Sequence, residues 1–70
     1  MQKTKYIIIE HMPDCAWEWW AVMKNKTPEQ GVQAYLDDMG YDKDDRKTKI
    51  EKDGVYGVSA DVRAYEISIL

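Results

Sequence analysis

Two groups of side chains have residue types that can do chemistry, and the first is His11, Asp14 and Cys15. A cysteine nucleophile needs an imidazole base beside its sulfur and a third group that orients the imidazole. The spacing of these three residues matches no local catalytic signature, and a chain of 70 residues offers little depth from which to exclude water. We therefore expect an ordinary half-buried thiol at Cys15, a surface strand residue at His11, and no catalysis.

The second group is an acidic run that resembles the start of a calcium-binding loop, formed by Asp42, Asp44 and Asp45. Such a loop needs an oxygen ligand at its fifth position and a glycine at its sixth, which here are Arg46 and Lys47. Cys15 is the single cysteine, so it can neither close an internal disulfide nor belong to a cysteine-rich zinc site. We expect no metal and no cofactor.

The elements that position these side chains begin with two strands. Segment 3–12 is apolar on both faces, with Tyr6 and Ile8 on one and Ile7 and Ile9 on the other, so it predicts a central strand. Pro13 breaks that strand, and segment 17–24 predicts a second strand paired antiparallel to it. Strict alternation in the second strand places Trp17, Trp19, Ala21 and Met23 on one face and Trp20 and Val22 on the other.

The clearest local signal is Thr27-Pro28-Glu29-Gln30, which predicts the start of a helix. Thr27 is a good N-cap, proline suits the first helical position, and Gln30 completes a capping box. An apolar stripe then recurs at helical spacing up to Met39, and Gly40 supplies the left-handed stop. The sequence predicts one helix over 28–39 that docks on a sheet.

The remainder predicts a loop and further strands. Segment 41–49 is polar, Asp53-Gly54 is a two-residue hairpin signal between 47–52 and 55–60, and 62–70 alternates as a final strand. A turn of helix over 59–64 is an alternative for that boundary. The whole chain, 1–70, is predicted to be one α+β domain, a small antiparallel sheet of four or five strands in ββαββ order with one helix packed on a face.

Composition narrows the class of protein. The chain is 44% hydrophobic and 33% charged, unlike a disordered or membrane-spanning chain, and it carries neither a signal-peptide nor a lipidation pattern, so a cytoplasmic location is expected. Three tryptophans and five tyrosines are many for 70 residues. Because large aromatic side chains dominate small cores, we expect most of these rings to be structural.

Charge is distributed unevenly. Between Glu29 and Asp45 there are six acids and one base, which gives this segment a net charge of −5 in a chain whose net charge is −3. Two of these acids stand at the negative end of the helix dipole, where they are locally disfavoured. The sequence thus predicts an acidic patch whose partner-binding residues are Asp37, Asp38, Tyr41, Asp42, Asp44 and Asp45.

Three functions fit this pattern. The favoured one is a noncatalytic protein-binding module that docks its acidic patch on a basic surface of a partner, with Trp20, Tyr41 or Tyr56 as aromatic anchors. The second is a nucleic-acid-binding protein that stacks bases on aromatic rings. Its basic strip would consist of Lys3, Lys5, Lys24, Lys26, Arg46, Lys47, Lys49, Lys52 and Arg63, although a pI near 5.0 argues against it. The third is a subunit of a homo-oligomer.

The succession Tyr6-Ile7-Ile8-Ile9, then Trp19-Trp20-Ala21-Val22, then the capped helix and a terminal hairpin resembles small phage and mobile-element proteins, including anti-CRISPR proteins of ββαββ arrangement. The resemblance lies in the arrangement of the whole chain, and it assigns no individual binding residue. It implies an inhibitor of a host or defence complex that blocks a basic nucleic-acid-binding site.

Overall fold

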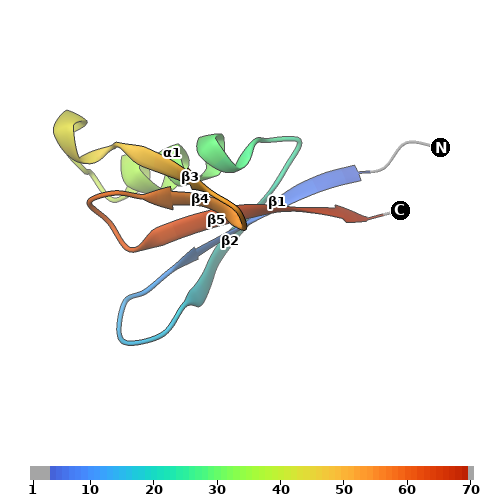
Figure 1. Cartoon of the computed structure of the whole chain (residues 1–70), viewed down its shortest axis with the longest axis horizontal. Coiled ribbons are helices and arrows are strands. Elements are labelled where there is room, and N and C mark those ends of the chain that lie inside the picture. The colour runs from blue at the N-terminus through green and yellow to red at the C-terminus, as the bar shows by residue number, and fades with distance from the viewer. Residues whose placement is uncertain (1–3, 70) are drawn as a thin grey trace.

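The computed structural model describes residues 4–69, which form five strands, one α-helix and one 3-10 turn (Figure 1). In chain order they are β1 (Thr4–His11), β2 (Glu18–Lys24), α1 (Pro28–Asp38), η1 (Lys43–Asp45), β3 (Thr48–Glu51), β4 (Gly54–Gly57) and β5 (Val62–Ile69). The predicted α+β class and single helix are therefore confirmed. Lys3 and Leu70, which the sequence places in the two terminal strands, lie outside the described residues.

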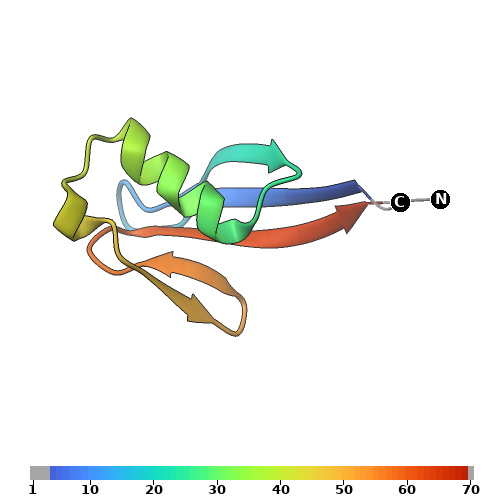
Figure 2. The same cartoon turned by 90° about the horizontal axis from the view of Figure 1, so that it is seen from above.

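The strands form one antiparallel sheet in the order β2-β1-β5-β4-β3. The two longest strands, β1 and β5, lie side by side in the middle, and their paired ends project beyond the helix (Figure 2). Helix α1 crosses one face of this sheet (Figure 2). The opposite face is not covered by any element among residues 4–69, and we call it the open face.

Helix α1 begins where the sequence predicts. The Gln30 N–H donates to the Thr27 hydroxyl oxygen at 3.1 Å, and the Thr27 N–H donates to the Gln30 side-chain oxygen at 2.8 Å. This reciprocal capping box satisfies two amide groups that the first turn would leave without partners. Eleven residues are too few for a stable helix in isolation, so docking must supply the rest of its stability.

The core lies between α1 and the sheet. Its largest fully buried side chains are Ile7, Ile9, Leu36, Val32 and Val62, all less than 2% exposed. In β1 and β5, alternate residues point into this core, as their alternating pattern predicts. All eight buried hydrophobic residues belong to this one cluster on the helix side.

A β-bulge in β2 overturns the predicted faces of that strand. Ile9 pairs with Ala21 but Glu10 pairs with Trp19, so Trp20 is an extra residue between two regular pairs. Trp20 and Ala21 both lie on the helix side, where they pack against the core. Trp19 lies on the open face beside Glu10 and is 64% exposed.

The bulge therefore places Trp19 and Trp20 on the opposite faces from those expected of their predicted groups. The prediction grouped Trp19 with Ala21 and Met23, but those two residues contact the core without it. It grouped Trp20 with Val22, which instead pairs with Ile8 on the open face and is 44% exposed. Of the eight aromatic residues, all within 4–69, only Trp19 is exposed; Tyr35 is buried, and Trp20 and Tyr41 pack against the core.

The final hairpin is present, but its turn is displaced by one residue. Glu51 pairs with Gly54, so the two turn residues are Lys52 and Asp53 rather than Asp53 and Gly54. The segment expected to be a loop contains the η1 turn and the start of β3, and the connection before β5 is a bend rather than a turn of helix.

Candidate protein-binding site at the acidic end

The acidic residues come together at the C-terminal end of α1. Gly40 adopts φ = 74°, its N–H donates to the Asp37 carbonyl oxygen, and the Tyr41 N–H donates to the Leu36 carbonyl oxygen. These two hydrogen bonds form a Schellman motif, which reverses the chain directly after the helix. The reversal places the η1 turn beyond the end of α1 (Figures 1 and 2). We call this region the acidic end, and it comprises Asp37, Asp38, Tyr41, Asp42, Asp44 and Asp45.

Arg46 fixes the shape of the acidic end. Its Nη1 donates to Asp37 Oδ1 at 2.7 Å, and its Nε donates to the Tyr41 carbonyl oxygen at 2.7 Å. The Gln33 side-chain amide in turn donates to the Arg46 carbonyl oxygen at 2.9 Å. The arginine therefore connects the helix to the turn, and it compensates the charge of one predicted binding residue, Asp37.

The other four carboxylates differ from Asp37. Asp38, Asp42 and Asp44 are exposed and Asp45 is half-buried, and within residues 4–69 none of the four makes an ion pair. Lys43 and Lys47 lie in the same segment and are exposed, which reduces the local excess of negative charge. The acidic end thus keeps four uncompensated carboxylates on a turn that hydrogen bonds hold in place.

A shallow hollow of about 420 Å³ opens within the acidic end. It is lined by Tyr35, Met39, Gly40, Tyr41, Asp42 and Asp45. Met39 is 46% exposed and Tyr41 is half-buried, so apolar surface and the two carboxylates of Asp42 and Asp45 line the same accessible space. Tyr35 and Met39 were not among the predicted site residues, although their spacing of four residues, just before Gly40, indicates neighbouring positions at the end of the helix.

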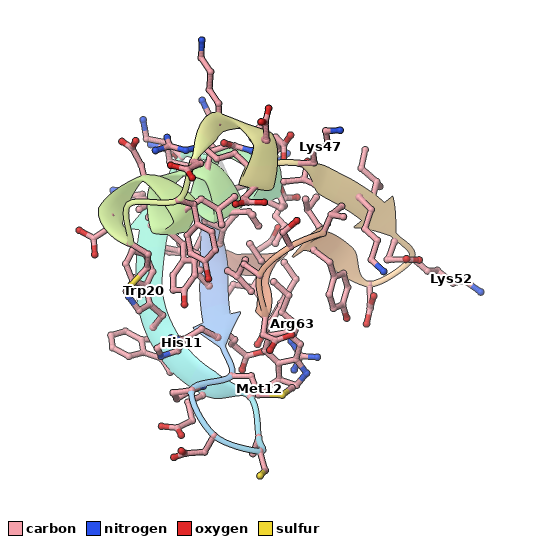
Figure 3. All side chains as sticks on the ribbon, turned by 90° about the vertical axis from the view of Figure 1, so that its left-hand side faces the viewer. His11, Met12, Trp20, Lys47, Lys52 and Arg63 are labelled. Carbon is pink, nitrogen blue, oxygen red and sulfur yellow. The ribbon has the colours of Figure 1, made fainter. Side chains whose placement is uncertain are left out.

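Aromatic contacts hold Tyr35 in position. Its ring packs edge-on against Trp20 with centroids 5.0 Å apart and against His11 with centroids 5.5 Å apart, and its hydroxyl lies 3.3 Å from His11 Nδ1. His11 and Trp20 lie next to each other on one side of β1, with Arg63 on the other (Figure 3). Burial, followed by the nearby Tyr41 and Asp61, raises the pKa of Tyr35 above its ordinary value.

His11 and Cys15, the potentially reactive residues at the end of β1 and in the connection after it, have surroundings that differ from the predicted ones. His11 is half-buried on the helix side and interacts with Tyr35, rather than lying free on a strand surface. Cys15 is exposed in the connection between β1 and β2, rather than half-buried. The surroundings of His11 depend on where α1 docks, because its partner Tyr35 is a helix residue 24 positions away in the sequence.

The basic residues between positions 4 and 69 do not form one continuous strip, and the ninth candidate, Lys3, lies outside the described part of the chain. Arg46 is paired with Asp37, Lys5 with Glu66, Lys49 with Glu51 and Arg63 with Glu10, while Lys24 stands on the edge strand opposite β3. Four of the nine bases counted as candidates for binding phosphate thus contact carboxylates of the same chain. This distribution favours the acidic end over a basic strip as the candidate site.

Two further features of the described residues bear on the class of site. Among residues 4–69, no group of three His, Cys, Asp or Glu side chains is placed to hold a metal ion. In the same part of the chain, no helix has the length and apolar character needed to cross a membrane.

No protein-family model, curated protein or solved structure matches this chain.

Proposed function

We propose that the chain is a noncatalytic protein-binding module that docks its acidic end on a basic surface of a partner protein. The observation that supports this proposal is the group of four carboxylates without an ion pair among the described residues, two of which, Asp42 and Asp45, line an accessible hollow. Carboxylates on a fixed turn attract a basic surface over a distance of about one Debye length, roughly 8 Å at physiological salt. Such attraction raises the association rate and orients the two proteins.

The hollow supports a specific anchor, the side chain of a partner arginine or lysine. The aliphatic stem of that side chain would lie against Met39 and Tyr41, and its charged end would approach Asp42 and Asp45. Long basic side chains combine an apolar stem with a charged head, which matches the apolar and acidic walls of this site. Aromatic and charged side chains in a concave site are typical of interface anchors.

The resemblance to small phage and mobile-element proteins of the anti-CRISPR type supports an inhibitory role. In that role the acidic end occupies a basic nucleic-acid-binding site of a host or defence complex in the cytoplasm, and the chain acts in a one-to-one ratio with its target. A carboxylate cluster can occupy such a site because it offers the same charge as the phosphates that normally bind there.

The test compares two charge-reversal variants of equal net charge. D42K/D44K changes the acidic end, whereas D14K/E18K changes two exposed acids at the β1–β2 connection. Affinity purification from the native cell with each variant as bait, followed by mass spectrometry, identifies the partner. We expect D42K/D44K to lose this partner and D14K/E18K to keep it.

Kinetics with the purified partner then test the mechanism. For the wild-type chain the association rate should fall as salt concentration rises, and in D42K/D44K it should be slower at low salt and depend less on salt. Equal association rates for wild type and D42K/D44K at low salt would refute the role of the acidic end. Retention of single-stranded DNA or RNA in a gel shift would instead favour the nucleic-acid alternative.

A further inference from the structure

The open face of the sheet carries large apolar and aromatic side chains where polar ones are usual. In an antiparallel sheet with one solvated face, residues normally alternate between apolar toward the core and polar toward water. Here the outward positions of β1, β2 and β5 include Tyr6, Ile8, Trp19, Val22, Tyr65 and Ile67. None of these six is buried in the single chain. Contiguous exposed apolar surface of this kind marks an interaction site.

The charged groups on the two central strands of this face, β1 and β5, compensate each other, whereas Lys24 of the edge strand β2 makes no ion pair among the described residues. Arg63 Nε donates to Glu10 Oε1 at 2.8 Å, and both side chains are largely shielded, at 27% and 18% exposure. The Arg63 guanidinium also lies 4.3 Å from the centre of the Trp17 ring. The single arginine of the open face is therefore already occupied by a carboxylate and an aromatic ring, which makes it a poor phosphate-binding group.

The size of the open face fits a protein interface. The five strands contain 31 residues, and at about 3.3 Å along the strand and about 4.8 Å across it for each residue they give a flat footprint of roughly 500 Å². The accessible area of a face studded with large side chains exceeds its footprint. A stable protein–protein contact needs about 800 Å² from each partner.

We propose that a second copy of this chain covers the open face, in a two-fold symmetric dimer of face-to-face sheets. Two such faces meet without an uncompensated charge on their central strands β1 and β5, because each brings its own Glu10–Arg63 pair. Sheets packed in this way lie about 10 Å apart with interdigitated side chains. The dimer also supplies a second core to a chain in which, among the residues whose burial the structure describes, eight hydrophobic residues are buried, all on the helix side.

The edges of the sheet are less suited to self-association than the open face, and the first of them is β3. That edge is four residues long and carries Lys49 and Glu51, features that discourage pairing with another strand. The other edge, β2, carries the bulge at Trp20. Its two apolar side chains on the open face, Trp19 and Val22, are the most exposed of the patch and provide the test.

The test uses W19K/V22K and a matched control, I50K/V58K. All four residues are exposed in the single chain, at 64%, 44%, 85% and 56%, but Ile50 pairs with Val55 on the helix side and Val58 lies in the β4–β5 connection. Because the four side chains are exposed, both variants should keep the far-ultraviolet circular dichroism of the folded chain. Sedimentation equilibrium then measures the mass.

We expect the wild-type chain and I50K/V58K to sediment at twice the chain mass of 8.2 kDa at tens of micromolar. In W19K/V22K the dissociation constant should rise by about 100-fold or more, since each lysine removes an apolar contact and buries a charge. Dilution of the wild-type dimer should shift tryptophan emission to longer wavelength as Trp19 becomes solvated. The variant should show no such concentration dependence.

Three results would overturn the proposal: a wild-type chain that stays at 8.2 kDa up to about 1 mM, a dimer that W19K/V22K leaves intact, or a dimer that I50K/V58K disrupts equally. Binding of a single-stranded oligonucleotide to a monomeric wild-type chain would also overturn it, and would assign the face to nucleic acid. The result is independent of the acidic end, because D42K/D44K should remain dimeric.

Discussion

Glu10 and Arg63 face each other across β1 and β5, and a 2.8 Å hydrogen bond joins their side chains on the open face, one pair before the His11–Val62 end of the ladder. Burial opposes the charge of the guanidinium, but its interactions with Glu10 and Tyr56 outweigh burial and raise the pKa of Arg63. The pair links the two longest strands of the sheet. It thus stabilises the register on which both the core and the open face depend.

Removal of this pair should destabilise the chain. R63A leaves the shielded Glu10 carboxylate without its partner and removes the packing of the guanidinium over Trp17. We expect the free energy of unfolding to fall by about 1.5–3 kcal/mol, the range for a hydrogen bond to a charged group. Urea unfolding at one fixed protein concentration measures it.

The exposed pair Lys5–Glu66 is the control for that prediction. Its atoms are 4.0 Å apart and its side chains are 62% and 42% exposed, so K5A should change the free energy of unfolding by less than about 0.5 kcal/mol. A loss in R63A no greater than that in K5A would show that the Glu10–Arg63 pair does not secure the register.

The parts of the fold that sequence could predict are those in which local chemistry decides the structure. Thr27 and Gln30 specify the helix start within one turn, and Gly40 specifies its end, so both were predicted correctly. Strand periodicity sorted the residues of β1 and β5 into two faces, but it did not say which face the helix covers. In each case the deciding contacts join residues close in sequence or follow from strand periodicity.

The errors arise where distant segments decide the structure. Whether Trp19 or Trp20 faces the core depends on the register against Glu10, and alternation within β2 contains no sign of the bulge. At the acidic end, the charge count stopped at Asp45, one residue before the arginine that compensates Asp37. The pairing of Arg46 with Asp37 depends on the chain reversal at Gly40, so a count of charges along the sequence could not predict it.

The close approach of α1 to β1 predicts a clash at Gly31. A Cβ atom at this position would lie 2.5 Å from Ile7 Cδ1 and 3.1 Å from Ile9 Cγ1, in a fully buried part of the core. Alanine normally favours a helix by about 1 kcal/mol over glycine. Overpacking costs about 1–3 kcal/mol, so we expect G31A to be net destabilising in thermal or urea unfolding.

A double variant isolates the cause. I7V removes the Cδ1 methyl that G31A would meet, and alone it should cost about 0.5–1.5 kcal/mol. In G31A/I7V the loss should be smaller than the sum of the two single losses, because the clash is relieved. Additive losses would show that Ile7 is not the obstacle.

The raised pKa of Tyr35 predicts a stability that declines in alkali. The phenol keeps its proton more tightly in the folded chain than in the unfolded chain, so above the ordinary tyrosine pKa near 10 the unfolded state releases a proton first. The free energy of unfolding should therefore fall as pH rises through 10. Y35F cannot ionise, and the difference between wild type and Y35F should shrink over that range.

The same variant reports on the contact with His11. At neutral pH, Y35F removes the hydroxyl that lies 3.3 Å from His11 Nδ1, and we expect a loss of about 0.5–1.5 kcal/mol. Urea unfolding of both proteins between pH 7 and pH 11 gives both quantities. A difference that stays constant up to pH 11 would contradict the protonation argument while leaving the hydrogen bond intact.

Gly54 and Gly40 both have positive φ, but their surroundings predict different costs for alanine. At Gly40, φ is 74° and a Cβ atom would meet nothing within 4 Å, so G40A should cost about 1–2 kcal/mol, the penalty for a left-handed residue. At Gly54, φ is 153° and the Cβ atom would lie 2.5 Å from the Ala64 carbonyl oxygen. Backbone of the central strand β5 cannot move aside as a side-chain tip can, so G54A should cost more than G40A in parallel urea unfolding. Equal losses would mean that β4 can shift away from β5. In that case the positive φ of Gly54, rather than its close contact with Ala64, would be what requires a glycine.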